Sequence, residues 1–157
     1  MGIEIERKFL LVNDEWKSLI SSSTYFKQGY LSGSDKSSVR VRIEGDQANI
    51  NIKSMTLAIT RQEYEYAIPF KDAEKILAEL CQQPLIEKTR HIVFYDNYKW
   101  EIDEFSGDNI GLIVAEIELE HENEKFSIPS WIGEEVSDQV KYYNVNLIKY
   151  PFSSWKE

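Results

Sequence analysis

Most of the chain alternates with a period of two residues between polar, often charged, and apolar side chains, most clearly in eight separate segments, and this pattern constrains the fold more than any other feature. Neighbouring side chains of an extended strand point to opposite faces, so each segment predicts a strand with one charged and one apolar face. The expected strands comprise residues 3–11, 25–31, 38–44, 48–53, 60–68, 87–94, 98–105 and 112–120. Eight strands joined by short connections predict an antiparallel barrel or sandwich.

Turn and loop signals separate these segments. Gly45-Asp46 and Asp96-Asn97 have the residue types of tight hairpin turns. Ser21-Ser22-Ser23 and Ser32-Gly33-Ser34 predict loops, because clusters of Ser and Gly between periodic segments rarely belong to strands. No repeat and no low-complexity stretch interrupts this organisation.

Helices are the minority. The longest is expected over residues 73–82, with Asp72 as its N-cap and Pro84 just beyond its end. Shorter helices are expected after Asn13 and after Asn144. A mainly β fold with a few peripheral helices follows.

The bulk properties bound the class of protein. The length of 157 residues predicts a single domain over residues 1–157. Cys81 is the single cysteine, so we expect no internal disulfide, a reducing compartment and a thiol that packs beside a helix. No signal peptide or membrane span is evident, which predicts a cytoplasmic protein without a membrane partner. The net charge of −9 disfavours nucleic acid as a partner.

The charged strand faces are sorted by sign. A charged face is ordinarily the solvated face, and this interpretation is open for any single segment. Solvated faces usually mix both signs, because like charges placed close together repel. Here acidic residues gather on some strands and basic residues on others. The acidic residues are Glu4, Glu6, Glu63, Glu65, Glu101, Asp103, Glu116 and Glu118, and the basic residues are Lys8, Arg40, Arg42, Lys53, Arg61, Lys88 and Arg90.

The alternative is that the charged faces point into the lumen of a closed eight-stranded antiparallel barrel. Such a barrel is just wide enough inside for side chains or one small ligand. Burying this much charge requires pairing, hydration or bound ions. Two divalent cations would turn the slightly acidic lumen positive and suit it to a polyanion such as triphosphate.

A family resemblance supports the inward orientation. Glu4-Ile5-Glu6-Arg7-Lys8 matches an ExExK motif, and over nearly its whole length the chain resembles the CYTH family, also called triphosphate tunnel metalloenzymes. The other matching segments are Gln28-Gly29-Tyr30-Leu31, Val39-Arg40-Val41-Arg42, Ile52-Lys53, Glu63-Tyr64-Glu65, Lys88-Thr89-Arg90, Trp100-Glu101-Ile102-Asp103, Ala115-Glu116-Ile117-Glu118-Leu119, Gly133-Glu134-Glu135-Val136 and Tyr143-Asn144.

The resemblance implies an eight-stranded tunnel that binds a triphosphate together with Mg²⁺ or Mn²⁺, two ions being expected. The small single-domain bacterial members, which this chain resembles most, hydrolyse inorganic tripolyphosphate. We therefore expect a triphosphatase that transfers a phosphoryl group in line to water. The expected catalytic residues are Glu4, Glu6, Lys8, Asp103, Glu116 and Glu118.

Carboxylate oxygens are the ligands that Mg²⁺ and Mn²⁺ prefer. The family pattern pairs Glu4 and Glu6 with Glu118 around a first metal, while Asp103 and Glu116 would support a second metal or the attacking water. The phosphates would be held by charge and by the bidentate forks of arginine. The residues expected in that role are Lys8, Arg40, Arg42, Lys53, Lys88 and Arg90.

Other residues have two interpretations or a supporting role. Arg61 would either hold a phosphate or pair with neighbouring acids, and Tyr30 would either contact substrate or simply pack. For Glu63 and Glu65 we favour orientation of the basic residues over metal binding. Glu101 would support the metal site.

Several residues are expected outside the tunnel. His91 has the strand parity opposite to Lys88 and Arg90, and His121 follows the last acidic strand, so we place both at the surface. The Trp residues should cover the outside of the barrel. An outward apolar face would suit the helices or the interface of a homodimer.

Three rival functions stay open. A class IV adenylate cyclase would use the same tunnel, but those cyclases carry a His-Phe pair near the start of the chain, which this N-terminus lacks. Thiamine triphosphate and nucleoside triphosphates are alternative substrates. A module that binds polyphosphate without turnover is disfavoured, because plain anion binding does not require the acidic pairs.

Overall fold

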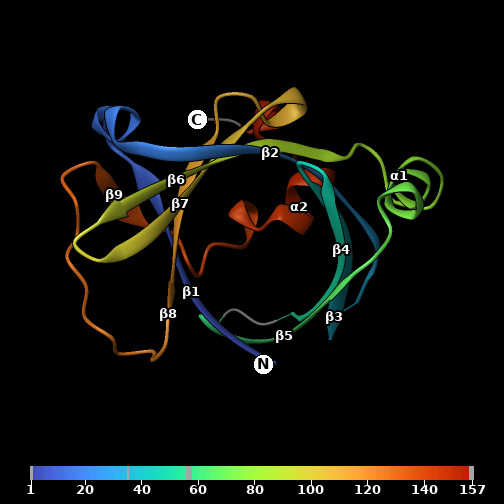
Figure 1. The fold of residues 1–157 in the computed structure, drawn as a ribbon, viewed down its shortest axis with the longest axis horizontal. Helices are drawn as coiled ribbons and strands as arrows, with labels where there is room; N and C mark the ends of the chain where they lie inside the picture. Colours follow the sequence, from blue (N-terminus) through green and yellow to red (C-terminus); the bar gives the residue numbers. More distant parts are fainter. Residues whose placement is uncertain (1, 35, 56–57, 156–157) are drawn as a thin grey trace.

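The computed structural model describes residues 2–34, 36–55 and 58–155. Its dominant feature is one antiparallel sheet that closes into a barrel (Figure 1). The strands follow the order β5-β4-β3-β2-β6-β7-β8-β1-β9, and a further pairing of β5 with β1 closes the ring. The predicted eight-stranded closed antiparallel barrel is therefore confirmed, with β9 as an addition outside the ring.

The strand bounds agree with the predicted segments to within about two residues, with one large exception. The strands are β1 (Ile3–Leu11), β2 (Ile20–Gly33), β3 (Ser37–Glu44), β4 (Gln47–Ser54), β5 (Thr60–Ala67), β6 (Ile86–Tyr95), β7 (Tyr98–Phe105), β8 (Ile113–Leu119) and β9 (Ile132–Glu135).

The exception is β2, which begins at Ile20 instead of residue 25. The loop predicted at Ser21-Ser22-Ser23 was wrong, because this stretch continues the ladder with β6 from Ile20↔Val93 onward. The loop predicted at Ser32-Gly33-Ser34 was also partly wrong, since β2 extends to Gly33. Backbone pairing with a neighbouring strand outweighs the local preference of Ser for loops.

Two further differences concern short elements. The helix α1 (Phe70–Glu79) begins earlier than predicted, so Asp72 lies in its first turn and Pro69 occupies the N-cap. The carboxylate of Asp72 still suits the positive end of the helix dipole. The strand β9 was missed, because four residues are too few to show an alternating pattern.

The shorter helices lie where the sequence suggested. A 3₁₀ helix, η1 (Glu15–Leu19), follows Asn13, and the α-helix α2 (Asn144–Lys149) ends before Pro151. At the predicted turn between β6 and β7, Asp96 and Asn97 have φ of 51° and 68°. Two successive left-handed residues match the twist of a tight hairpin.

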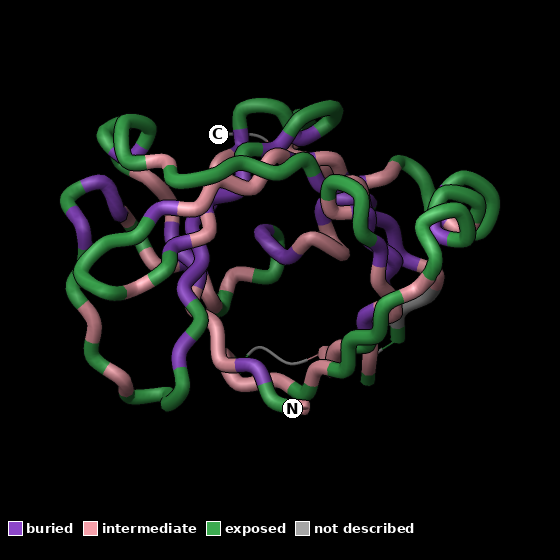
Figure 2. The backbone as a smooth tube through the Cα atoms, in the orientation of Figure 1, coloured by how far each residue is buried: buried purple, intermediate pink, exposed green. Residues whose placement is uncertain are grey.

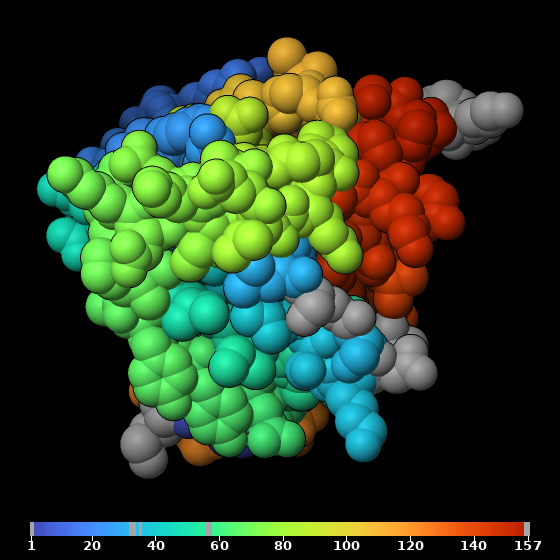
Figure 3. Space-filling model, turned by 90° about the vertical axis from the view of Figure 1, so that its right-hand side faces the viewer, coloured from blue at the N-terminus to red at the C-terminus, as the bar shows by residue number. Residues whose placement is uncertain are grey.

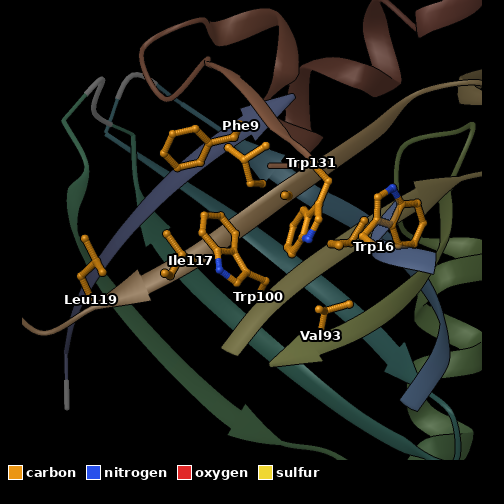
Figure 4. Packing of buried hydrophobic residues seen from close by; sticks show 10 residues of the cluster. Phe9, Trp16, Val93, Trp100, Ile117, Leu119 and Trp131 are labelled. Carbon is orange, nitrogen blue, oxygen red and sulfur yellow. The ribbon is translucent and has the colours of Figure 1, made fainter. Parts of the chain in front are cut away.

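The apolar outer face of the barrel is covered unevenly. Around β1, β7 and β8, a large cluster encloses Trp100 and Trp131, whose rings meet edge to face with centroids 5.7 Å apart (Figure 4). Trp16 closes the same cluster from η1. These three Trp residues do cover the outside, as predicted. Another cluster places α1 against β3 and β4 and includes the buried thiol of Cys81, whose pKa burial raises.

The outside of β5 and the end of β4 remain bare by comparison. Ile52, Tyr64 and Tyr66 are exposed there, whereas residues of the β1–β8 wall are mostly buried or half-buried (Figure 2). The space-filling view in Figure 3 shows this side of the molecule, with α1 and β5 in green. Within the described residues, the structure contains no helix that is long and apolar enough to cross a membrane.

Candidate functional site

The barrel encloses a cavity of about 270 Å³ whose walls are predominantly charged. The alternation predicted from the sequence therefore directs the charged faces inward. Burial of Lys8, Arg40 and Arg42 at 6–7% exposure confirms that these faces are not solvated. The predicted site residues that line the cavity are Glu4, Glu6, Lys8, Tyr30, Arg40, Arg42, Lys53, Arg61, Glu63, Glu65, Lys88, Arg90, Glu101, Glu116 and Glu118.

Strand register brings acidic residues together on one wall. Glu6 of β1 lies opposite Glu118 of β8, and Glu116 lies opposite both Lys8 of β1 and Glu101 of β7. Oxygens of Glu6, Glu101 and Glu116 all lie within 4.8 Å of one another. Like charges placed so closely repel.

The close approach of these carboxylates raises the pKa of two of them. Burial, followed by the charges of Glu116 and Glu4, raises the pKa of Glu6 well above its ordinary value. Burial and the nearby Glu4 and Glu101 also raise the pKa of Glu118. A divalent cation would remove both penalties, and carboxylate oxygens are its preferred ligands. The donor set on this wall therefore fits Mg²⁺ or Mn²⁺.

Glu116 contacts two basic groups, one with each of its oxygens. Its two oxygens lie 3.6 Å from Lys8 Nζ and 3.1 Å from Arg90 Nη2. Burial alone would raise the pKa of Glu116, but Lys8 and Arg90 outweigh burial and hold it well below its ordinary value. Glu116 thus joins the acidic cluster to the basic wall.

Asp103 is fully buried and does not line the cavity, because it lies beneath Lys88 and Arg90. One of its oxygens accepts a hydrogen bond from Arg90 Nε at 2.7 Å. The other lies 2.8 Å from Arg90 Nη2 and 2.7 Å from Lys88 Nζ. Both oxygens are therefore already engaged by cations. This geometry orients the basic groups, whereas the sequence suggested that Asp103 supports a metal or a water.

The basic groups crowd one another as well. Burial, then the charges of Arg40 and Arg90, lowers the pKa of Arg42 to about 10. Burial is also the main cause that lowers the pKa of Lys88 to about 7, while Asp103 opposes that shift. Mutual repulsion among buried cations is relieved when a polyanion binds between them. This wall is suited to phosphate.

The supporting carboxylates pair with basic groups, as favoured from the sequence. Lys53 Nζ lies 3.0 Å from Glu4 and 3.6 Å from Glu63. Glu65 lies 3.9 Å from Arg40, and Asn51 donates to Glu63 at 2.9 Å. Glu101 belongs to the acidic cluster and also lies 3.4 Å from Arg90 Nη1.

Two residues with open interpretations now have defined surroundings. The guanidinium carbon of Arg61 lies 4.6 Å from the centre of the Tyr143 ring. Stacking on an aromatic face leaves its donors available to a ligand. Tyr30 lines the cavity and at the same time packs in the cluster under α2, so it satisfies both descriptions.

Some lining residues had not been assigned a role from the sequence. The α2 segment lies within the ring of strands (Figure 1), where Tyr143, Asn144 and Val145 line the cavity. Phe26 places its ring 4.8 Å from the guanidinium carbons of both Arg42 and Arg90. Strand parity could have found Phe26, which shares a face with Tyr30. The inward path of α2 had no comparable signal.

The histidines lie outside the lumen, as predicted. His91 packs on the Trp16 ring, and its two ring nitrogens lie 2.7 Å from Ser23 Oγ and 3.0 Å from a Glu104 oxygen. The backbone of His91 is paired with Ser23 of β2 and with Ile102 of β7 in the two neighbouring ladders. His121 is exposed at the surface.

A closed antiparallel barrel whose lumen contains an acidic cluster facing buried cations is the architecture of triphosphate tunnel proteins. The model of the CYTH domain family matches residues 2–149, and the chain belongs to this family.

Two curated relatives are similar over nearly their whole length. An inorganic triphosphatase of Acetivibrio thermocellus is 45% identical over 157 residues, which is 100% of both chains. An inorganic triphosphatase of Nitrosomonas europaea is 33% identical over 148 residues, covering 92% of this chain and 95% of that protein. The crystal structure of the inorganic triphosphatase NE1496 superposes with a TM-score of 0.64 at 30% identity, covering 94% of this chain and 95% of that one.

Proposed function

We propose that this protein is a metal-dependent inorganic triphosphatase that hydrolyses tripolyphosphate to pyrophosphate and phosphate. The observation that carries the proposal is the separation of charge within one lumen, where a carboxylate cluster on β1, β7 and β8 faces buried cations from β3 and β6. The similarity to two inorganic triphosphatases supports the choice of substrate.

The carboxylates have the role of holding divalent cations. Glu6, Glu101 and Glu116 form the core of the site, with Glu4 and Glu118 beside them. When bound, Mg²⁺ or Mn²⁺ would neutralise phosphate charge and lower the pKa of a coordinated water. The identity of the ion and the presence of a second one remain predictions. Asp103 is assigned instead to holding Arg90 and Lys88.

The basic residues have the role of binding and orienting the phosphates. Arg40 and Arg42 project from β3, and Lys88 and Arg90 from β6, so the anion would be gripped from two strands. Lys8 lies beside Glu116, where it can stabilise charge on the reacting phosphoryl group. In-line phosphoryl transfer depends mainly on such positioning and charge stabilisation.

The cavity favours a compact polyanion over a nucleotide. The apolar and aromatic side chains of its described lining are Phe26, Tyr30, Met55, Tyr143 and Val145. The rings of Phe26 and Tyr143 already stack against basic groups. A cyclase must seat adenine beside its triphosphate. Adenylate cyclase and nucleoside or thiamine triphosphatase activity therefore rank below tripolyphosphatase activity.

The test is a phosphate-release panel with tripolyphosphate, ATP and thiamine triphosphate, each with Mg²⁺ and with Mn²⁺. We expect tripolyphosphate to give the highest kcat/KM, and release to stop when EDTA is added. Production of cyclic AMP from Mg-ATP would support the cyclase instead. Tight binding of tripolyphosphate without phosphate release in either metal would support the binding module.

A homodimer, one of the two coverings considered for the outer apolar face, is also a proposal. The exposed side chains of Ile52, Tyr64 and Tyr66 offer an apolar outer face for it. Sedimentation analysis of the wild-type chain and of a Tyr66→Lys variant tests whether this face is used.

A further inference from the structure

The segment at the start of α2 contacts basic groups that belong to the barrel wall. Asn144 is the first residue of α2 and lines the cavity. Its Oδ1 accepts a hydrogen bond from Lys88 Nζ at 3.0 Å and another from Gln28 Nε2 at 3.4 Å. Two donors from neighbouring strands therefore converge on one amide oxygen that comes from outside the sheet.

Gln28 extends this connection to a third strand. It lies in β2, in register with Arg42 of β3 on one side and Ile86 of β6 on the other. Its side chain is fully buried, and its Oε1 accepts a hydrogen bond from Arg42 Nε at 3.0 Å. Because the guanidinium is planar and rigid, a bond to Nε fixes the direction in which its two terminal nitrogens point.

Lys88 is subject to two competing attractions. Its ammonium group forms an ion pair at 2.7 Å with Asp103, which is fully buried and does not line the cavity. The bond to Asn144 holds the same nitrogen from the side of α2. A flexible lysine stem would otherwise be free to follow the stronger partner, the carboxylate.

We propose that Asn144 is a positioning residue for the triphosphate, which keeps Lys88 directed at the cavity and, through Gln28, fixes the orientation of Arg42. Binding of the polyanion then depends on a residue that touches neither the acidic cluster nor the reacting bond. The inference rests on the proposed function in its choice of tripolyphosphate as ligand.

The test compares Asn144→Ala with Asn146→Ala. Asn146 lies in the same helix, but its Nδ2 donates to the backbone oxygen of Val140 at 2.8 Å, outside this network. Binding of tripolyphosphate to the metal-free protein is measured by calorimetry. We expect the Kd to rise about tenfold in Asn144→Ala, the size of one lost hydrogen bond to a charged group, and to stay unchanged in Asn146→Ala.

Steady-state kinetics provide a second readout with metal present. In Asn144→Ala the KM should rise about as much as the Kd, with a smaller change in kcat, because the phosphates lose orientation while the acidic cluster is intact. Gln28→Ala combined with Asn144→Ala should cost less than the sum of the single changes, since both act in one network. Circular dichroism of each variant checks that the fold is retained.

The outcomes separate this inference from the proposed function. An unchanged Kd in Asn144→Ala, or an equal rise in Asn146→Ala, would overturn the positioning role even if the wild type hydrolyses tripolyphosphate. A wild type that binds tripolyphosphate without hydrolysing it, and loses that binding in Asn144→Ala alone, would refute the triphosphatase and uphold the positioning role.

Discussion

Two walls of the same barrel differ both inside and outside. The wall of β1, β7 and β8 carries the acidic cluster within and is covered outside by the aromatic cluster around Trp100 and Trp131. On the opposite wall, β3 and β4 face the cavity with Arg40, Arg42 and Lys53, and β5 exposes Tyr64 and Tyr66 to solvent. The opposite wall is covered by α1 over β3 and β4 but is bare along β5, so the carboxylates proposed to hold the metal lie on the wall with the more continuous covering.

The largest expected effect comes from Glu6→Gln on the acidic wall. Turnover of tripolyphosphate should fall by about 10³-fold or more, because the substitution removes a carboxylate that we propose as a metal ligand. The metal-free protein should nevertheless melt a few degrees higher, since the substitution removes a carboxylate repelled by Glu116 and Glu4.

Phosphate release and thermal unfolding measure the two effects separately. Arg7→Gln is the matched control, since Arg7 points outward from the same strand and pairs with Glu135. Wild-type turnover in Glu6→Gln would remove this residue from the metal site, and a lower melting temperature would contradict the crowding of charge.

Substitutions in the aromatic cluster and on the bare face of β5 should differ by several kcal/mol in their cost to the free energy of unfolding. Trp131→Ala should cost about 3–5 kcal/mol of unfolding free energy, because it empties a large buried site against Trp100. Tyr66→Ser on the bare wall should cost less than about 0.5 kcal/mol. Urea denaturation of both variants checks the contrast, and similar costs would mean that the exposed face of β5 is covered in solution, for example by a second copy of the chain.

On the basic wall, Arg42→Ala should mainly weaken binding. We expect the KM for tripolyphosphate to rise about 10- to 100-fold with a smaller fall in kcat, because a bidentate phosphate contact is lost while the acidic cluster is retained. Initial rates over a range of substrate concentrations measure both parameters. An unchanged KM would show that Arg42 does not hold a phosphate.

The smallest predicted effect is a pH dependence of the metal-free protein. The folded-state pKa of Glu6 is raised, so the folded form binds more protons than the unfolded form between pH about 4.5 and that raised value. Stability should therefore fall as the pH rises through this window. Subtracting the unfolding free energy of Glu6→Gln from that of the wild type at each pH isolates the contribution of Glu6 from that of Lys88. A difference that does not change from pH 5 to 8 would contradict the prediction.

Strand parity explains which parts of this site could be predicted from the sequence. A period of two tells which side chains share a face, and the sorting of charge together with the family resemblance indicated that the face of Glu6, Arg42 and Lys88 points inward. Parity does not tell which strands become neighbours around a closed ring. The engagement of both Asp103 oxygens by Arg90 and Lys88 depends on that arrangement, which is why the sequence assigned Asp103 to the metal instead.

Features without periodicity escaped prediction. The inward path of α2 is set by the packing of Leu147 and Ile148 beneath the strands, and such tertiary contacts leave no regular pattern in the sequence. The Ser residues of β2 were misassigned for a similar reason, since their strand conformation is imposed by β6. Local propensity is a weak guide wherever a neighbouring strand provides the hydrogen bonds.

The closure of the ring has a consequence for how this enzyme would lose activity. Among the described residues, β1 is registered with β5 at three positions, Ile3 to Ile5, with further backbone hydrogen bonds from Glu6 to Ile59 and from Glu63 to Gly2, whereas β2 and β6 are registered at eight. Transient opening of so short a seam would swing Glu4 away from Lys53 while most of the sheet stayed intact. On warming, the protein would then lose catalytic activity at temperatures where its circular dichroism spectrum is still that of the folded state. Amide hydrogens along the β1–β5 seam would exchange before those of any longer ladder.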